Sequence, residues 1–259
     1  MIWLYDYPDD VILLIFMGIT LVSMWVLHQV FRLMLRRFMT PESFELNVNI
    51  HESIVTIITL VLAFSLVQVI DNMHQVDALA SKEAAYINNL DRLLTRYGTP
   101  EVGTIRGTLL AYAKSRVDQD WPSLVNGEPS QATAEIFMPL SRDVYAIKPS
   151  NEREVVLYGQ AVRLADDIAQ SRDAMIEATG IRLAPVYWIL IGLAFGVKVF
   201  VSALTTRTTI GDIVFAAQMT VLAALFALVF IFDQPYKGES GVKPEALTKT
   251  IHAMQTRVY

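Results

Sequence analysis

The residues with the clearest chemical potential lie along one apolar stretch of membrane-spanning length, residues 50–70. At 100° per residue, one face of a helix there carries four small or polar residues: Glu52, Thr56, Thr59 and Ala63. Three further polar residues lie on the opposite face, nearer the other end: Ser65, Gln68 and Asn72. Lipid offers such groups no hydrogen bonds, so we expect them to contact protein or a water path. All seven are therefore candidate pore-lining residues, and the alternative is helix packing with the hydroxyl groups bonded to their own backbone.

A second set of polar residues falls at similar depth within the apolar part of the chain: His28, Glu52, Lys198 and Gln218. Counted at 1.5 Å per residue, Lys198 and Gln218 lie about 9 Å inside the membrane boundary. A lysine at that depth costs about 1–3 kcal/mol on insertion. Its side chain can snorkel to the interface, pair with Glu52 or face a water-filled vestibule. We therefore predict a buried polar layer near one end of the spanning helices.

No catalytic or metal-binding pattern accompanies these residues. The chain has no cysteine, and its four histidines form no HExxH pair. GxSxG and Walker motifs are absent, and the spacing of Ser202, four residues after Lys198, is the only feature of a serine–lysine dyad. The net charge of −5 provides no basic surface for nucleic acid. We expect no enzymatic activity, no cofactor, no metal site and no nucleic-acid partner.

The elements that must position these residues are membrane-spanning helices. Of the 259 residues, 53% are hydrophobic and only 18% are charged, a composition typical of a membrane protein with a soluble portion. Four apolar stretches are long enough to span a bilayer: residues 11–35, 50–70, 184–204 and 212–232. The first two predict an N-terminal hairpin within residues 1–70. The last two predict a C-terminal hairpin, residues 184–232.

Between the hairpins, residues 71–183 are more polar and more charged, which predicts a water-exposed domain. Apolar residues recur at spacings of three, four and seven between Val76 and Tyr97, so the second spanning helix is expected to continue into this domain. Period-two alternation is almost absent. We therefore predict an all-α integral membrane protein whose soluble domain is entirely helical and whose tail, residues 233–259, turns at its proline and glycine residues before a final helix.

Glu83 interrupts the apolar face of the continuing helix. A carboxylate at such a core position has two ordinary roles. It pairs with an arginine such as Arg106, or it joins a ring of equivalent residues around a symmetry axis. The second role makes Glu83 a candidate residue for the wall of a vestibule.

Small residues in the third and fourth spans predict close helix–helix contacts. The third span carries Gly192 and Gly196 in a GxxxG arrangement, which lets two backbones approach closely. The fourth span has a face of small residues: Ala216, Thr220, Ala223, Ala224 and Ala227. We expect both faces to pack against other helices.

An even number of spans places both termini and the soluble domain on the same side of the membrane. Arginines crowd the opposite, short-loop side: Arg32, Arg36, Arg37 and Arg207. The positive-inside rule then places the loops in the cytoplasm and the domain in the periplasm of a Gram-negative cell. Several basic residues near the membrane on the domain side oppose this orientation: Lys82, Arg182, Lys237 and Lys243. We expect a multi-pass protein of the bacterial inner membrane with a periplasmic domain.

Two sequence patterns resemble those of a bacterial bestrophin-like membrane protein family of unknown function. The first lies in the soluble domain: Lys82-Glu83-Ala84-Ala85, Leu90, Leu93, Pro100, Arg106, Tyr112 and Asp120-Trp121-Pro122. The second follows the last span: Asp233-Gln234-Pro235-Tyr236-Lys237-Gly238, then Val242-Lys243-Pro244. Members of that family usually have Phe in place of Tyr236 and Glu in place of Asp120. The resemblance covers nearly the whole chain.

The resemblance implies a channel like the bestrophins, which are pentameric, conduct anions and line the pore with the second span. It also implies a cytoplasmic domain, contrary to the charge distribution. We predict a homo-oligomeric channel for inorganic ions in a lipid bilayer, with anions as one option, because Lys198 attracts anions whereas an unpaired Glu52 repels them. The alternative is a membrane-anchored sensor or scaffold whose helical domain binds a ligand or a partner protein.

Overall fold

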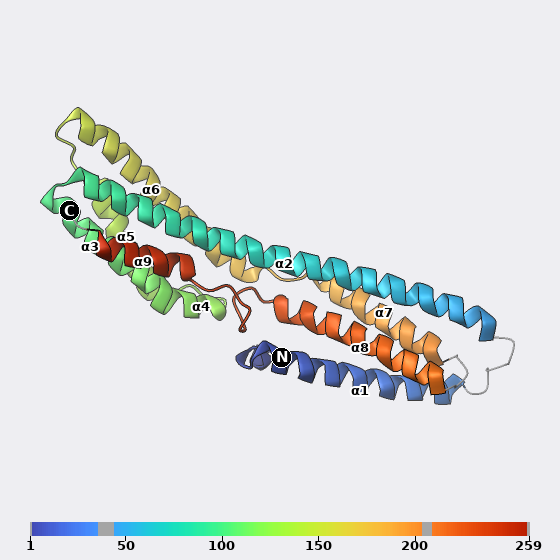
Figure 1. The fold of residues 1–259 in the computed structure, drawn as a ribbon. Coiled ribbons are helices and arrows are strands. Elements are labelled where there is room, and N and C mark those ends of the chain that lie inside the picture. Colours follow the sequence, from blue (N-terminus) through green and yellow to red (C-terminus); the bar gives the residue numbers. More distant parts are fainter. Residues whose placement is uncertain (1, 36–43, 204–208, 258–259) are drawn as a thin grey trace. The chain divides into compact units, whose positions relative to one another are not determined.

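The computed structural model describes the backbone of residues 2–35, 44–203 and 209–257, and the side chains of residues 4–34, 53–203 and 210–257. Regular structure within these ranges is entirely helical. The α-helices are α1 (Asp9–Leu35), α2 (Phe44–Tyr97), α3 (Pro100–Ser115), α4 (Trp121–Val125), α5 (Gln131–Tyr145), α6 (Glu152–Glu177), α7 (Pro185–Ala203), α8 (Thr209–Phe232) and α9 (Glu245–Thr256). Three shorter elements are η1 (Ile2–Asp6), the π-helical turn η3 (Arg116–Asp120) and η4 (Ala178–Gly180). Figure 1 shows the order of the helices.

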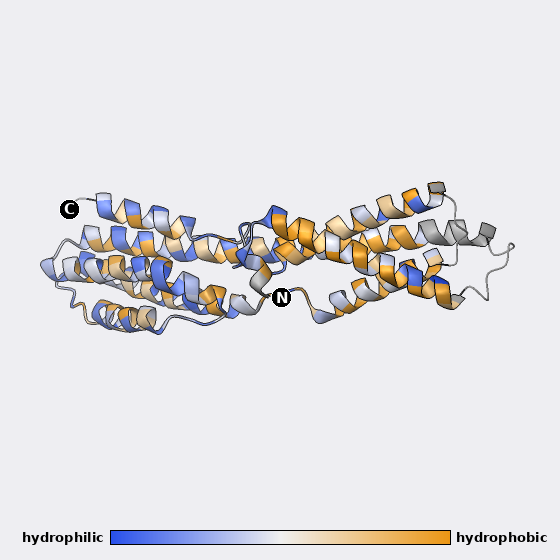
Figure 2. Cartoon of the chain, turned by 90° about the horizontal axis from the view of Figure 1, so that it is seen from below, coloured by the Kyte–Doolittle hydropathy of each residue, from blue (hydrophilic) through white to orange (hydrophobic). Residues whose placement is uncertain are grey.

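The chain folds into two compact units. Unit 1 consists of Met1–Asn72 and Arg182–Gly241, and unit 2 consists of Met73–Ile181 and Val242–Tyr259. Helix α2 contributes its first part to unit 1 and its last part to unit 2. Apolar residues predominate along the helices of unit 1, whereas polar residues are frequent along those of unit 2 (Figure 2). The predicted tail is divided, because its residues up to Gly241 belong to unit 1 and the rest to unit 2.

Four helical segments in the described part of the chain are long and apolar enough to cross a membrane: Asp9–Met34, Ser53–Tyr97, Glu152–Ala203 and Ile210–Phe232. Each overlaps one of the four predicted spans, so the predicted all-α membrane fold with helical segments between the spans is confirmed. In unit 1 the apolar faces of α1, α2, α7 and α8 pack around one core: Met24, Ile58, Leu62, Ile191, Phe195, Val199, Met219 and Leu222. Close packing of these side chains holds the four helices together.

Helix α2 is unusually long because no glycine or proline interrupts its 54 residues, which correspond to about 80 Å at 1.5 Å each. It ends at Gly98, whose φ of +78° favours glycine, and α3 begins with Pro100. In unit 2 the apolar side of α2 is buried as its periodicity predicts: Val76, Ala80, Ile87, Leu90 and Leu94.

The segment after α8 turns back onto the start of the chain within unit 1. Asp233 accepts a hydrogen bond from the backbone N–H of Leu183 at 2.7 Å, and the backbone N–H of Ser240 donates to Asp9 at 2.9 Å. Gly238 has a φ of +79° and lies so close to Asp9 that a Cβ would come within 3.4 Å of a carboxylate oxygen. The proline- and glycine-containing tail therefore has the architectural turn that its sequence predicts.

The small residues of α7 and α8 have different surroundings. A Cβ added to Gly192 or Gly196 would meet no atom within 4 Å, and both glycines border an apolar groove of about 630 Å³ in unit 1. On α8, Ala223 and Ala227 are fully buried, whereas Ala224 is half-buried. The close helix contact predicted for the glycine pair is therefore not made by the described residues.

Candidate functional site

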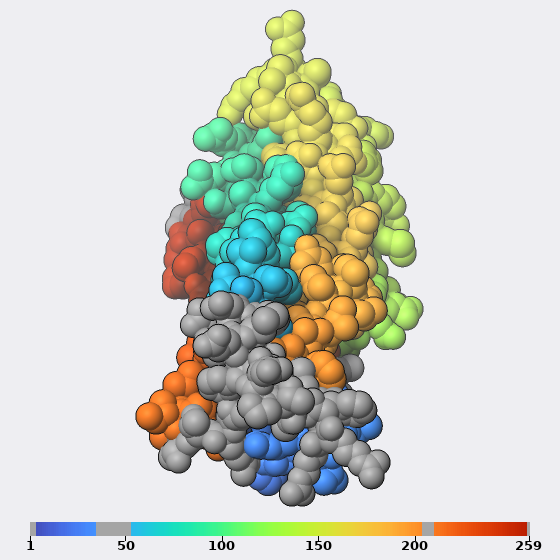
Figure 3. All heavy atoms as spheres, turned by 90° about the vertical axis from the view of Figure 1, so that its right-hand side faces the viewer, coloured from blue at the N-terminus to red at the C-terminus, as the bar shows by residue number. Residues whose placement is uncertain are grey.

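The first set of candidate pore residues lies on a face of α2 that unit 1 leaves open. Thr56, Thr59 and Ala63 are exposed, whereas the intervening Ile58 and Leu62 are buried in the core of the unit. Figure 3 shows side chains of α2 uncovered on the face turned to the viewer. The side chain of Glu52, the fourth predicted member of this stripe, lies outside the described residues. Lipid, water or another copy of the chain must cover this stripe.

The second set of candidates lies mainly inside unit 1. Ser65 is fully buried and donates a hydrogen bond to the backbone oxygen of Val61 at 2.8 Å. Asn72 is also buried, and its side-chain oxygen accepts a hydrogen bond of 3.1 Å from Gln68, which is exposed. Ser65 and Asn72 therefore fit the helix-packing alternative within the protomer. Neither side chain reaches the surface that a pore between protomers would use.

The predicted polar layer comes together from three helices of unit 1. The ammonium group of Lys198, fully buried on α7, donates a hydrogen bond of 2.8 Å to the side-chain oxygen of Gln218 on α8. One turn further along α7, Ser202 Oγ lies 2.9 Å from His28 Nδ1 on α1. The sequence placed His28, Lys198 and Gln218 at one depth, and the structure adds Ser202 to them.

Ser202 has two hydrogen-bond partners within unit 1. Its Oγ lies 2.8 Å from the backbone oxygen of Val199, to which the hydroxyl can donate, and 2.9 Å from His28 Nδ1. A serine hydroxyl has one hydrogen, so when it donates to Val199 the imidazole donates to Ser202.

An aromatic ring joins the two halves of the layer. Phe215 on α8 lies with its centroid 5.1 Å from that of the His28 ring, and the ammonium group of Lys198 lies 5.9 Å from the same centroid. A cation within about 6 Å of a ring face is attracted by its quadrupole. Phe215 therefore lies beside one member of each polar pair, His28 and Lys198.

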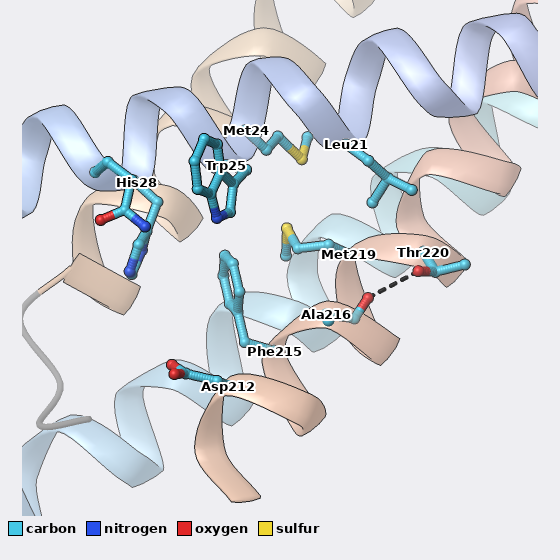
Figure 4. A pocket seen from close by; sticks show the side chains of 10 residues that line it. Leu21, Met24, Trp25, His28, Asp212, Phe215, Ala216, Met219 and Thr220 are labelled. Carbon is cyan, nitrogen blue, oxygen red and sulfur yellow. Dashed lines mark hydrogen bonds between the residues drawn. The ribbon is translucent and has the colours of Figure 1, made fainter. Parts of the chain in front are cut away.

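A cavity of about 390 Å³ gives access to this layer between α1 and α8. Figure 4 shows His28 and Trp25 on α1 facing Phe215 and Asp212 on α8. The polar side chains of the lining come from both helices: His28, Gln29, Asp212 and Thr220. Cavities of this size hold water or a small ligand. The polar layer is thus adjacent to space that polar species can enter.

Glu83, the predicted vestibule residue, lies in the interior of unit 2. It is fully buried and accepts hydrogen bonds from Arg116 Nε at 2.7 Å and from the hydroxyl of Tyr112 at 2.9 Å. A second guanidinium nitrogen of Arg116 lies 2.5 Å from the other carboxylate oxygen. The role as an ion pair is correct, but its partner is Arg116, because Arg106 pairs with Asp91 at 2.7 Å. The side chain does not face a vestibule.

The same network extends through the π-helical turn η3. Arg116 also pairs with the fully buried Asp120, which accepts a 2.5 Å hydrogen bond from the backbone N–H of Ser130. Burial alone lowers the pKa of Arg116, but the adjacent Glu83 outweighs this and raises it above its usual value. Burial, together with the charge of Glu83, raises the pKa of Tyr112 well above its usual value. Arg116 was not among the predicted site residues, although Asp120 belongs to a sequence pattern that marks this turn.

Comparison with known proteins identifies relatives of the whole chain. The family model described as Bestrophin-like domain matches residues 14–247. Among solved structures, a mutant of a bacterial bestrophin homologue from Klebsiella pneumoniae has a TM-score of 0.70 at 10% identity, covering 93% of this chain and 99% of its own. A second mutant from that organism has a TM-score of 0.68 at 12% identity, covering 92% and 94%. No curated protein matches the sequence. These identities are so low that the structural likeness establishes the fold alone.

Proposed function

Because the chain belongs to the Bestrophin-like family, we propose that it forms a homo-oligomeric ion channel with α2 next to the pore. The observation that carries the proposal is the exposed stripe of Thr56, Thr59 and Ala63, which lies between the buried seam of α2 at Ile58 and Leu62 and an exposed apolar flank. Hydroxyl groups gain nothing from acyl chains. Around a symmetry axis of several copies, the same stripe would face water and ions.

The charges on α2 in unit 2 support anions as the conducted species. Its exposed charged side chains there are three basic residues and one acidic residue: Lys82, Arg92, Arg96 and Asp77. A ring of such helices would have a positive potential, which raises the local concentration of anions. In unit 1 the buried ammonium group of Lys198 has the same sign. The family resemblance favours the same ion class.

Flux through liposomes tests the proposal. We expect the purified protein to be oligomeric and to release chloride from loaded vesicles. Ala63→Trp fills the open stripe of α2 and should abolish most of the flux. The matched control, Leu14→Trp, adds a ring of the same size to an exposed position on α1 and should leave the flux unchanged. A monomeric protein, or one without flux under any ion gradient, would contradict the proposal.

A second candidate function is a membrane-anchored sensor or scaffold. The observation that favours it is a cleft of about 430 Å³ on unit 2, lined by three arginine side chains. A protein that produces no current and no flux but binds a ligand through unit 2 would support this function over conduction.

The location proposed is the bacterial inner membrane with unit 2 in the periplasm, as the positive-inside rule favours. The absence of cysteine makes this simple to test, because one introduced thiol is the only site that a maleimide can label. Glu128→Cys is exposed, in the turn after α4. Labelling of intact spheroplasts by a membrane-impermeant maleimide is expected. Labelling only after lysis would place unit 2 in the cytoplasm.

A further inference from the structure

The cleft on unit 2 lies between α2 and α6, and both helices contribute polar side chains with the same spacing. Asn89, Arg92 and Arg96 come from α2, and Gln160, Arg163 and Asp167 come from α6. Each set follows an i, i+3, i+7 pattern, which places its members on one face of a helix. Leu93 and Leu164 form the apolar part of the lining. Two amides, three guanidinium groups and one carboxylate therefore converge on one concave surface.

The arginines of this cleft differ from those in the interior of unit 2. Arg106, Arg116 and Arg257 each pair with a buried aspartate or glutamate. By contrast, none of the three cleft arginines forms a salt bridge with any residue of the described ranges. The one side-chain hydrogen bond among them runs from Arg163 Nε to the backbone oxygen of Gly159 at 3.2 Å. Guanidinium groups that share a cleft but form no salt bridge with its single carboxylate, Asp167, are suited to an anion from outside the chain.

The charge balance selects the kind of anion. Three arginines and one aspartate give the lining a net charge of +2. A phosphate monoester carries close to two negative charges at neutral pH and has three oxygens that accept hydrogen bonds. Asp167 would repel a bare anion, but it can accept a hydrogen bond from a hydroxyl group on the same ligand. The two amides can donate to the remaining oxygens.

We propose that this cleft binds a small organic phosphate that carries a hydroxyl group, with its phosphate between Arg92, Arg96 and Arg163. The volume of about 430 Å³ lies within the range of small-molecule sites. Binding needs no ion conduction, so the site stands whether the membrane part is a channel or an anchor. In a channel, a dianion here would neutralise much of the exposed positive charge of α2 and would thereby regulate anion entry.

Calorimetric titration of the full-length protein in detergent tests the site, with glycerol 3-phosphate as the probe and glycerol at matched salt as the blank. We expect saturable binding of glycerol 3-phosphate and none of glycerol. Arg163→Gln should weaken the affinity at least tenfold. The matched control is Arg142→Gln, because Arg142 is a highly exposed arginine of α5 outside the cleft, and its loss should leave the affinity unchanged. Both variants alter exposed residues, and unchanged melting temperatures will verify their folding.

Asp167→Asn gives an independent readout of ligand orientation. The variant should bind inorganic phosphate more tightly than the wild type does. Its affinity for glycerol 3-phosphate, divided by its affinity for inorganic phosphate, should be lower than in the wild type. Short-chain phosphatidylglycerol, used as a soluble monomer, distinguishes a lipid headgroup from a free metabolite. Tighter binding of the lipid than of glycerol 3-phosphate, together with weaker lipid binding in Arg163→Gln, would support the same site with a lipid headgroup as its ligand. Absence of any phosphate binding, or wild-type affinity in Arg163→Gln, would overturn the assignment, and neither result would affect the flux experiment on α2.

Discussion

Buried charged side chains have different hydrogen-bond partners in the interiors of the two units. In unit 2, Glu83 and Arg116 are both fully buried and neutralise one another, with Asp120 and Tyr112 completing the hydrogen bonds. In unit 1, the fully buried Lys198 donates to the neutral amide of Gln218, and its neighbour His28 bonds to a serine hydroxyl.

The difference indicates which of the two interiors is architectural. Removing a partner from a buried ion pair leaves an uncompensated charge, so the network of unit 2 resists change and holds α2, η3 and α6 together. The described hydrogen bond of Lys198 has a neutral acceptor, which binds an ammonium group less strongly than a carboxylate does, and a cavity lies beside His28. Substitution should therefore damage stability in unit 2 and transport in unit 1.

The largest expected effect is in unit 2. Arg116→Met removes the guanidinium group from between Glu83 and Asp120 and should lower the free energy of unfolding by about 3–5 kcal/mol. Thermal and denaturant melts of the detergent-solubilised protein measure it. Arg142→Met, at a side chain 77% exposed, is the control and should change stability by less than about 0.5 kcal/mol. A loss below about 1 kcal/mol in Arg116→Met would remove the distinction between the two interiors.

Tyr112→Phe should have the next largest effect. It deletes the hydroxyl that donates to Glu83 and should cost about 1.5–3 kcal/mol at pH 7, since that acceptor is charged. Folding raises the pKa of Tyr112, so the folded protein holds this proton more tightly than the unfolded chain does. The contribution is complete below the ordinary tyrosine pKa of about 10 and is lost as pH rises toward the folded value. Melts from pH 8 to 11 should show a shallower alkaline loss in Tyr112→Phe than in the wild type.

Lys198→Met should have the reverse profile, with a small effect on stability and a larger one on transport. The loss of the charged hydrogen bond to Gln218 is offset by removal of a buried charge, so the net change in stability should be about 1 kcal/mol or less. A buried ammonium group acts on a passing anion through its field, and its removal should reduce anion flux about tenfold if that interaction is about 1.4 kcal/mol. Leu193→Met, a similar change at an exposed position of α7, is the control. Unchanged stability together with unchanged flux would leave Lys198 with no role in conduction.

Ser202→Ala should have the smallest effect. It removes the hydrogen-bond partner of His28 Nδ1 and should cost about 0.5–1.5 kcal/mol. A double-mutant cycle with His28→Phe measures the coupling between the two side chains. Additive losses would show that the 2.9 Å contact contributes nothing of its own.

Periodicity and depth made much of the fold predictable. Four apolar stretches predicted the spans, and the apolar periodicity between Val76 and Tyr97 predicted the continuation of α2 to Tyr97. Counting at a fixed rise per residue placed Lys198 and Gln218 at equal depth, and their side chains are 2.8 Å apart. Ser202 had been noted only for its spacing from Lys198.

Side-chain partners could not be predicted in the same way. Arg106 on α3 and Arg116 on η3 are both buried. The sequence does not show which of the two lies closer to Glu83. Arg116 and Asp120 are four residues apart, which places them on one helical face, but their spacing does not show that both are buried beside Glu83. Burial of Ser65 and exposure of Thr56 likewise depend on where α1, α7 and α8 pack against α2.

The sequence by itself determined the local quantities of this protein, namely which segments are helical, how long they are and how deep each polar residue lies, because these follow from composition and a fixed rise per residue. Only the tertiary structure decided which arginine neutralises Glu83, which flank of α2 stays open and which of the described arginines form no salt bridge. Those outcomes depend on the rotation of each helix about its axis, which is set by the packing of many side chains from distant parts of the chain.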